Sequence, residues 1–419
     1  SFLPRGRKIL LEVLPDVYDA LLAAGAFEHD VSRNAPRGST VEDGDLIYLR
    51  VRREVIEWAL RNAVLAEPNI AARPHTHITG LFGDAGSVPH VRGVTTANAE
   101  QIKGDLVVDA MGRRSPVPSW LPLLGGTPPE VDSSECGIVY YSRYFQLRPG
   151  HDFPEGPWLT FPQGDLGYAR FACFFEDNQI FGITLQVPTW DRQLHELRRD
   201  EAHMAACSAI PMLQSLVDPE IADPITPVLP MGSLQNTLRN YAPDGQPVAL
   251  GIIPVGDAYV HTDATFALGL SMSLIHTVAL GHAFAAHPSE PADMAVDYFA
   301  ATLPEAAERY ALVAAANNDR ARLWQGEKFD LASRSSSYAL FVILTAAAVA
   351  TRDPEVFRKV LRRAGLLDRT AELDDDIELQ ELVERIFAEM AAEGPRPPVG
   401  PTRDALLALI GASLKQEAV

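Results

Sequence analysis

The sequence predicts an α/β fold in which a three-layer parallel sheet is interrupted by an antiparallel sheet and followed by a helical tail. Two short apolar segments, 105–109 and 248–255, resemble strands that are covered on both faces of a parallel sheet. Residues 137–187 are rich in β-forming side chains, with turn residues between the runs. The chain after Pro291 has helical spacing throughout. This order of elements indicates a parallel layer with an inserted antiparallel sheet.

The first half of the chain begins with helices. Residues 7–24 have helical apolar spacing, interrupted at Pro15, and residues 51–66 form a second amphipathic helix. After Pro68 the pattern changes to short extended segments with glycine turns, which lead to the apolar strand 105–109.

The second half predicts the antiparallel sheet, one more parallel strand and the helical tail. The expected strands are 138–141, 168–175, 180–187 and 248–255. The expected helices are 191–208, 270–286, 292–317, 337–350, 353–363, 377–392 and 402–415.

Composition excludes several classes of function. The 419 residues include 36 Lys and Arg against 55 Asp and Glu, a formal charge of −19. Such a chain lacks the positive field needed for nucleic acid or anionic lipid. Its three cysteines lie far apart, so no metal site is expected, and their sparse use fits a reducing, cytoplasmic location. The longest apolar run, about 12 residues, is too short to span a membrane.

The first segment with chemical potential is 104–116. Its apolar strand ends at Asp109, and the small residue Gly112 follows in a turn where backbone could approach a ligand. Arg113 could face a phosphate group. The alternative is a strand that ends in an ordinary turn.

The second such segment is 252–271. An apolar strand ends in Gly256-Asp257, where a carboxylate at the carboxyl end of a parallel strand can accept hydrogen bonds from sugar hydroxyls. A polar loop then leads to a helix that begins near Gly269, whose amino terminus favours negative charge. The alternative is a strand, loop and helix with a solvent-facing aspartate.

From Ser1 to about Ala286 the chain resembles FAD-dependent monooxygenases of the aromatic-hydroxylase type, called group A. The most specific part is His261-Thr262-Asp263-Ala264-Thr265-Phe266, because similar proteins have His-Thr-Asn/Asp-Pro-Thr-Phe followed by Gly and Ser. The resemblance implies FAD and NAD(P)H as cofactors, and O2 and a small organic molecule as substrates. Hydroxylation would then proceed through a flavin C4a-hydroperoxide, with the protein orienting the flavin and excluding water.

The resemblance also implies residue roles. Asp257 would bind the ribityl and pyrophosphate region, and the amides of residues 269–271 would face the isoalloxazine ring. Either Arg52 or Arg53 would lie near the ribityl–phosphate side. The full set of cofactor residues expected is Arg52, Arg53, Asp109, Gly112, Arg113, Gly256, Asp257, Ala264, Gly269, Leu270 and Ser271.

The substrate would lie between the antiparallel sheet and the flavin. His261 and Asp263 would orient it or relay a proton, although they could equally be a pair that stabilises the loop. Alternation along the strands allows about half of the sheet's aromatic residues to face the substrate, and the rest belong to the core. The candidates are Tyr141, Trp158, Phe161, Tyr168 and Phe171.

Three departures from the family pattern are visible. No two glycines are separated by a single residue, so the GxGxxG turn is absent, and a βαβ unit of roughly 40–60 residues is expected ahead of Ser1. Ala264 stands where similar proteins have Pro, and Ala267 where many have Gly. We expect these changes to alter the geometry of the loop.

The expected domains are an FAD-binding domain over 1–130 and 226–290, an antiparallel substrate-binding sheet over 131–225, and a helical region over 291–419 that could form a homodimer contact. The different-class alternative is a non-catalytic flavoprotein homologue that serves as a ligand- or partner-binding scaffold. A reductase of isoprenoid type would share the fold. A flavin halogenase is disfavoured, because its Trp-x-Trp-x-Ile-Pro segment is not found.

Overall fold

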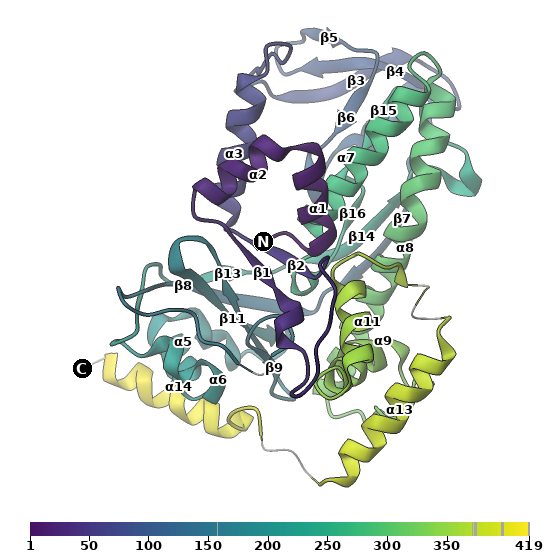
Figure 1. The fold of residues 1–419 in the computed structure, drawn as a ribbon. Helices are drawn as coiled ribbons and strands as arrows, with labels where there is room; N and C mark the ends of the chain where they lie inside the picture. Colours follow the sequence, from purple (N-terminus) through teal and green to yellow (C-terminus); the bar gives the residue numbers. More distant parts are fainter. Residues whose placement is uncertain (157, 371, 373–374, 395–397, 418–419) are drawn as a thin grey trace.

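The computed structural model describes residues 1–156, 158–370, 372, 375–394 and 398–417. The fold is the expected combination of parallel sheet, antiparallel sheet and helical C-terminal region, with the antiparallel sheet and the parallel strands in separate parts of the molecule (Figure 1). Two long helices run beside each other along one side, α7 (Gly269–Ala286) and α8 (Pro291–Trp324).

The two apolar segments predicted as parallel strands pair with each other. Strand β6 (Val107–Asp109) lies parallel to β15 (Ile252–Pro254), so that Asp109 is opposite Pro254. Both strands are shorter than the apolar runs. In the longer run, Gly251 has a φ of +69°, and this turn delays the start of β15. Because the strands are parallel, the segments that follow them emerge at the same edge.

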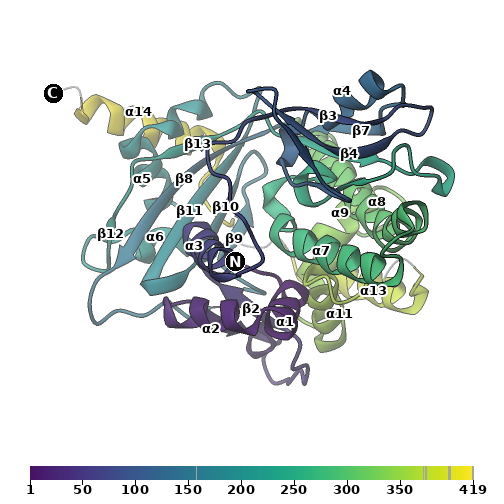
Figure 2. The same ribbon diagram turned by 90° about the horizontal axis from the view of Figure 1, so that it is seen from above.

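The antiparallel sheet has the strand order β12-β8-β11-β10-β9, with β13 also paired to β8. Its central strand β11 is buried along its whole length, because one face packs under α5 (Asp200–Ser208) and α14 (Arg403–Glu417) and the other faces the rest of the molecule (Figure 2). The strands are β8 (Ile138–Leu147), β9 (Gln163–Asp165), β10 (Arg170–Phe175), β11 (Ile180–Pro188), β12 (Ala222–Pro224) and β13 (Leu229–Met231).

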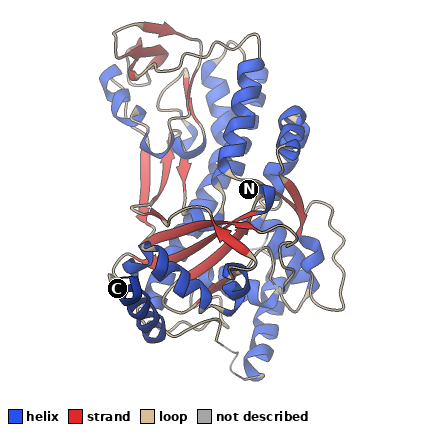
Figure 3. Cartoon of the chain, turned by 90° about the vertical axis from the view of Figure 1, so that its left-hand side faces the viewer, coloured by secondary structure: helices blue, strands red, loops and turns tan. Residues whose placement is uncertain are grey.

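A third sheet connects the two regions. Strand β14 (Gln235–Asn240) pairs on one side with β7 (Glu130–Glu135) and on the other with β16 (Val260–His261). Figure 3 shows these strands running between the upper and lower parts of the molecule. Since β16 lies inside the loop after β15, this sheet fixes that loop relative to both regions.

The N-terminal helices cover the start of α7. The break at Pro15 separates α1 (Pro4–Val13) from α2 (Pro15–Ala23), as the sequence predicts. Helix α1 packs on α7, and α2 packs on α3 (Arg53–Ala66) (Figure 1). The remaining strands of this half form two antiparallel sheets: β1 (Phe27–Asp30), β2 (Ile47–Arg50), β3 (Ile78–Asp84), β4 (His90–Thr96) and β5 (Gln101–Lys103).

The C-terminal region is helical, as expected. Helix α8 continues to Trp324, beyond the predicted end at residue 317, and contains Pro304. By length and composition α7 could cross a membrane, and it is the one such helix among the described residues, although here it packs against α1 and α8. The other helical elements are α9 (Tyr338–Leu340), the π-helical η10 (Phe341–Ala346), α10 (Ala347–Val349), α11 (Pro354–Ala364) and α13 (Ile377–Ala392).

Candidate functional site

The two segments selected from the sequence lie side by side. The turn after β6 forms the 3-10 helix η2 (Gly112–Arg114), and the turn after β15 forms η8 (Gly256–Ala258). Gly112 and Gly256 have φ angles of +73° and +57°, which side chains other than glycine adopt with strain. A Cβ placed on Gly112 would meet only Asp257, at 4.0 Å from its Cβ. The turns therefore approach each other closely at this edge of the sheet.

Asp257 lies between the Gly112 turn and the start of α7. Its side chain is 41% exposed, and its Oδ2 accepts a hydrogen bond from His261 Nδ1 at 3.1 Å when that nitrogen carries the proton. A Cβ at Gly269 would lie 3.6 Å from Asp257 Oδ1, so the carboxylate is adjacent to the first turn of α7. Leu268 at the N-cap provides no side-chain cap, so the amino-terminal N–H groups of α7 stay available to a ligand.

Arg239 of β14 joins the two turns. Its guanidinium donates to the carbonyls of Asp257 and Ala258 at 3.2 and 3.1 Å, and to that of Arg113 at 2.6 Å. Arg239 is only 8% exposed. We did not select it from the sequence, because an arginine within a strand carries no motif. The one feature in the sequence that could have indicated Arg239 was its position in a segment of alternating polar and apolar residues.

His276 of α7 contacts the turn at Gly256 from the helix side. Its Nδ1 accepts a hydrogen bond from the backbone N–H of Gly256 at 3.1 Å, which requires a neutral ring with the proton on Nε2. Burial lowers the pKa of His276 to about 4, so the ring stays neutral at physiological pH. The sequence reveals it only as a histidine on an apolar helix, which is usually a core residue.

Asp109 and Arg113 act on the backbone of the first turn. Asp109 is 2% exposed, and it accepts hydrogen bonds from the N–H of Met111 and, at 2.5 Å, from the hydroxyl of Ser115. Arg113 contributes its carbonyl to the contact with Arg239. Asp109 therefore shapes the turn through local hydrogen bonds, and Arg113 through the long-range contact of its carbonyl with Arg239.

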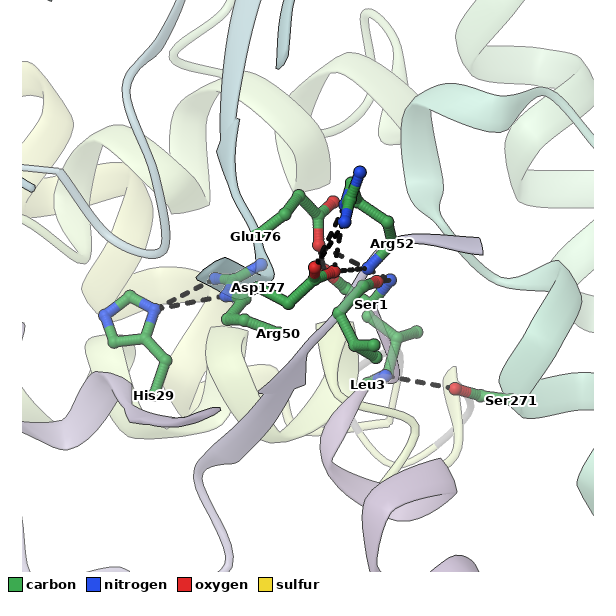
Figure 4. Close-up of polar contacts among 9 residues, drawn as sticks. Ser1, Leu3, His29, Arg50, Arg52, Glu176, Asp177 and Ser271 are labelled. Carbon is green, nitrogen blue, oxygen red and sulfur yellow. Dashed lines mark hydrogen bonds and ion pairs between the residues drawn. The ribbon is translucent and has the colours of Figure 1, made fainter. Parts of the chain in front are cut away.

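The two arginines that the sequence left undecided differ clearly. Arg52 at the N-cap of α3 forms an ion pair with the fully buried Asp177, at 2.7 Å from Nη2 to Oδ1 (Figure 4). Burial acts to raise the pKa of Asp177, but hydrogen bonds from Arg52 outweigh it and the pKa is lowered. The Arg53 side chain is 81% exposed and pairs with Glu57. Arg52 is thus committed to a structural pair, and Arg53 points to solvent.

The first turn of α7 carries the other predicted cofactor residues. Ser271 is buried, and its hydroxyl accepts a hydrogen bond from the N–H of Leu3 at 3.1 Å (Figure 4). Leu270 packs against the cluster formed by α1, α2 and α3. Gly269 is exposed beside Asp257. Of these three, Gly269 presents backbone toward the Asp257 side.

Asp263 is fully buried and has several partners. One carboxylate oxygen accepts hydrogen bonds from the Tyr140 hydroxyl and from the N–H and hydroxyl of Thr265, and the other accepts from Asn317 Nδ2 at 2.6 Å. Burial raises the pKa of Tyr140, and Asp263 raises it further. His261, by contrast, contacts Asp257, and its buried Nε2 has no hydrogen-bond partner among the described residues. The structure therefore separates the two residues proposed as catalytic.

The loop contains a left-handed residue at Ala267, where many proteins of the type named above have glycine. Ala267 has φ +53° and ψ +26°, directly before α7. Ala264 begins the short helix η9 (Ala264–Phe266), which Asp263 caps through the N–H of Thr265. The loop thus adopts a left-handed turn at an alanine, at some cost in strain.

Of the aromatic candidates, Tyr141 and Phe171 lie in strands of the antiparallel sheet, whereas Trp158, Phe161 and Tyr168 lie in the loops before β9 and β10. Tyr141 and Phe171 lie in the core under α5 and α14, on the face away from Tyr140 and Asp263. Tyr168 donates to the carbonyl of Pro401, ahead of α14. Phe161 packs on Phe174 with ring centroids 4.6 Å apart and lies near Arg50. Trp158 lines a cavity of about 1240 Å³ with Phe153, Phe175, His29 and Arg33.

The Asp257 region is chemically suited to the ribityl and pyrophosphate part of FAD, the part that the resemblance implies for Asp257. It combines a half-exposed carboxylate, two turns with positive-φ glycines, and an uncapped helix amino terminus. Hydroxyl groups and an electron-rich ring edge are suitable ligands for such a set. Asp257, Gly112 and Gly269 are the residues that could hold the group.

Comparisons with known proteins agree with this architecture. No family model matches the chain. A curated relative, protein Rv3254 of Mycobacterium tuberculosis, is 26% identical over 256 residues, which are 57% of this chain and 50% of that protein. The match therefore spans about half the length of this relative.

Solved structures match over most of the chain. The flavin-dependent brominase Bmp2 has a TM-score of 0.60 and 14% identity, covering 94% of this chain and 89% of that one. PqsL from Pseudomonas aeruginosa, named as a probable FAD-dependent monooxygenase, has a TM-score of 0.56 and 14% identity, covering 77% and 87%. 2-Methyl-3-hydroxypyridine-5-carboxylic acid oxygenase has a TM-score of 0.53 and 16% identity, covering 88% and 86%. The chain has the fold that these three proteins share.

Proposed function

We propose that this protein is a flavin-dependent oxidoreductase, and within that class an NAD(P)H-dependent monooxygenase that hydroxylates a small organic molecule. The observation that carries the proposal is the placement of Asp257, half-exposed between the Gly112 turn and the amino terminus of α7. The shared fold supports it, because three similar structures bear names of flavin-dependent or oxygenase proteins.

The residues of this chain have distinct roles in the proposal. Asp257 accepts hydrogen bonds from hydroxyl groups of the bound cofactor, and the amino terminus of α7 favours negative charge beside it. Arg239 and His276 keep the two turns in place through four hydrogen bonds to backbone groups of Arg113, Gly256, Asp257 and Ala258. When bound, FAD supplies the redox chemistry that no side chain here provides.

The expectations about surroundings belong to the same proposal. Molecular oxygen and NAD(P)H would be the co-substrates, the protein would be cytoplasmic, and the helical region would contribute to a homodimer. The expected domain limits, with the antiparallel sheet at 131–225 as the substrate-binding part, remain predictions of the same kind.

The test is direct measurement of flavin binding. We expect the protein to bind FAD. Binding is measured by titration, through the quenching of flavin fluorescence. The Asp257→Ala variant should bind FAD about tenfold more weakly or worse, because a charged hydrogen-bond acceptor is lost. Asp105→Ala, an exposed carboxylate at the opposite end of β6, is the matched control and should leave affinity unchanged.

Two outcomes would overturn the proposal. Absence of FAD binding in protein produced together with any coding sequence ahead of Ser1 would remove the flavoprotein assignment and favour the scaffold alternative. Equal loss in Asp257→Ala and Asp105→Ala, or no loss in either, would show that the Asp257 turn is not the cofactor site. Circular dichroism of each variant establishes that the fold is intact before the titration is interpreted.

A further inference from the structure

A large cavity lies at the edge of the antiparallel sheet, between β1, the loop ahead of β9 and the chain that follows α10. Its volume is about 1240 Å³. Pockets of about 300–1,000 Å³ already enclose most of a drug-sized molecule, so this cavity has room for a ligand of several rings. None of the residues that line it belongs to the turns at Gly112 and Gly256 or to α7. The cavity is therefore separate from the proposed cofactor site.

Four aromatic rings form one wall of the cavity. Phe153 stacks on Phe175 with ring centroids 4.5 Å apart, and on Phe27 with centroids 6.0 Å apart. Trp158 and Phe175 are in a T-shaped arrangement, with centroids 6.2 Å apart. Phe27, Phe153 and Trp158 are partly exposed, so their rings remain available to a ligand. Such a wall favours a flat aromatic ligand, because ring contacts add to the burial of apolar surface.

This wall is on the side of the sheet that is turned away from the cofactor-side loop. Phe175 projects to the same face of β10 as Phe171, which lies in the core away from Asp263. None of the residues that donate a hydrogen bond to the Asp263 side chain lines the cavity. A ligand here would therefore occupy a second site, beyond the substrate position of the proposed function.

His29 supplies a hydrogen-bond donor of fixed identity to the cavity. Arg50 donates to His29 Nδ1 from Nη2 at 3.0 Å and from Nε at 3.3 Å (Figure 4). Because a guanidinium only donates, Nδ1 is the acceptor and the ring carries its proton on Nε2. Burial, together with the charge of Arg50, lowers the pKa of His29 to about 4, so the ring is neutral at physiological pH. Nε2 lies on the side of the ring away from Arg50 and has no hydrogen-bond partner among the described residues.

Arg50 is itself held firmly, so the donor is positioned before any ligand arrives. Its side chain is buried, with the guanidinium 4.8 Å from the centre of the Tyr48 ring. It also donates to the carbonyl of Thr160 at 3.0 Å, directly after the loop residues Trp158 and Leu159 that line the cavity. One buried arginine thus connects the histidine donor to the loop that carries part of the aromatic wall.

The charged residues around the cavity balance one another. The lining contains three arginines and three acids, namely Arg33, Arg37, Arg352, Glu28, Asp30 and Glu155. Four of these six already take part in ion pairs, for example Arg33 with Asp30 at 3.4 Å. The lining therefore offers no excess charge that would select an ionic ligand.

We propose that this cavity binds a flat, uncharged aromatic molecule that carries a hydrogen-bond acceptor. The rings of the ligand pack against Phe153 and Trp158, and the acceptor receives the Nε2 proton of His29. A ligand without an acceptor would take that N–H out of water and leave it unpaired, which lowers its affinity relative to a ligand that accepts the bond.

Chromone, an uncharged two-ring aromatic ketone, is the probe for this site. Chroman keeps the fused ring skeleton but lacks the carbonyl, and chromone-2-carboxylate adds a negative charge. Calorimetric titration of the full chain without added flavin should detect saturable chromone binding. Chromone should bind about fivefold more tightly than either analogue, because only chromone combines the acceptor with a neutral ring system.

Three substitutions locate the binding. His29→Phe keeps a ring but removes the donor, so it should weaken chromone binding to the level of chroman and leave chroman binding unchanged. Phe153→Leu removes a ring from the wall and should weaken the binding of both ligands about fivefold. Trp58→Leu, at an exposed aromatic residue of α3 outside the cavity, is the control and should change neither affinity.

Several outcomes would overturn the proposal. Absence of saturable chromone binding, or unchanged binding in Phe153→Leu, would remove the site. Equal binding of chromone and chroman, or loss of both in a folded His29→Phe variant, would remove the donor role of His29. Binding of chromone-2-carboxylate as tight as that of chromone would exclude the uncharged class.

The comparison of the three ligands in the parent chain needs no substitution, so it decides the proposal even where a variant does not fold. Thermal unfolding without ligand establishes which variants are native. Because no flavin is added, chromone binding by a chain that does not bind FAD would count against the proposed function alone. FAD binding without chromone binding would count against this cavity alone.

Discussion

The loop between β15 and α7 has an aspartate near each end, and the two occupy opposite environments. Asp257 is 41% exposed at its side chain and contacts His261. Asp263, six residues later, is completely buried and accepts hydrogen bonds from Tyr140, Thr265 and Asn317. The Asp257 carboxylate can still accept hydrogen bonds from a ligand, whereas the Asp263 carboxylate already accepts hydrogen bonds from three parts of the chain.

This difference separates a binding role from an anchoring role within one loop. Hydrogen bonds to Asp263 come from β8, from the loop itself and from α8, so this residue joins the antiparallel sheet to the C-terminal helices. The positions around Asp257 are instead held by backbone contacts to Arg239 and His276, which leave its carboxylate available. We infer that Asp263 positions the loop and that Asp257 meets the ligand.

The largest effect is expected from removing the buried carboxylate. Asp263→Ala leaves Tyr140 and Asn317 without their acceptor in a buried site, so we expect unfolding free energy to fall by about 3–5 kcal/mol. Asp257→Ala should change it by less than about 1 kcal/mol, because the site is half exposed. Urea unfolding of both variants is the measurement. Equal destabilisation by the two substitutions would contradict the distinction between anchor and ligand residue.

The fold was predictable because its signals are periodic and local. Pro15 divides the first helical run into α1 and α2, and the run 377–392 matches α13. The turns at Gly112 and Gly256 were also identifiable, since a Gly after an apolar strand marks a special backbone conformation. The predicted strand 248–255 was too long, because hydrophobicity does not reveal the turn at Gly251.

The parts of the site that escaped prediction depend on contacts between distant elements. Arg239 bonds to residues 126 positions before it and 18 positions after it, and nothing near it in the sequence indicates either partner. The alternation of side chains along a strand also does not show which of its two faces contacts the loop between β15 and α7. The choice of Tyr141 over its neighbour Tyr140 shows this, since only Tyr140 contacts Asp263. Tertiary register decides these questions.

A middle-sized effect should come from protonating the histidine beneath the Asp257 turn. Burial lowers the pKa of His276 to about 4 from an ordinary 6.5. The unfolded chain therefore binds the proton first as the pH falls, and stability is lost between pH 6.5 and about 4, by up to about 1.4 kcal/mol per pH unit from this group. His203 and His29, whose pKa values burial also lowers to about 4, act in the same direction.

Urea unfolding at a series of pH values measures this effect. As the pH falls below 6.5, the unfolding free energy of His276→Phe should decrease less steeply than that of the parent chain. The difference in slope should approach that of one proton taken up on unfolding. His287, which is partly exposed at the end of α7 and pairs with Glu290 and Asp297, supplies the control, because its carboxylate partners raise its pKa, and His287→Phe should not reduce the fall. An unchanged slope in His276→Phe would mean that the ring under Gly256 is not held neutral.

The smallest effect concerns the backbone between the two aspartates and α7. Ala267 has φ +53°, a left-handed conformation that costs an alanine about 1 kcal/mol and that glycine adopts freely. We expect Ala267→Gly to stabilise the protein by about 0.5–1 kcal/mol, because the residue is exposed and no packing is lost. Ala264→Gly, at an exposed position in the same loop with ordinary φ, should destabilise it by a similar amount. Opposite signs in the two thermal shifts would establish that the loop keeps the left-handed turn with alanine present, whereas two losses of equal size would place Ala267 in an unstrained conformation.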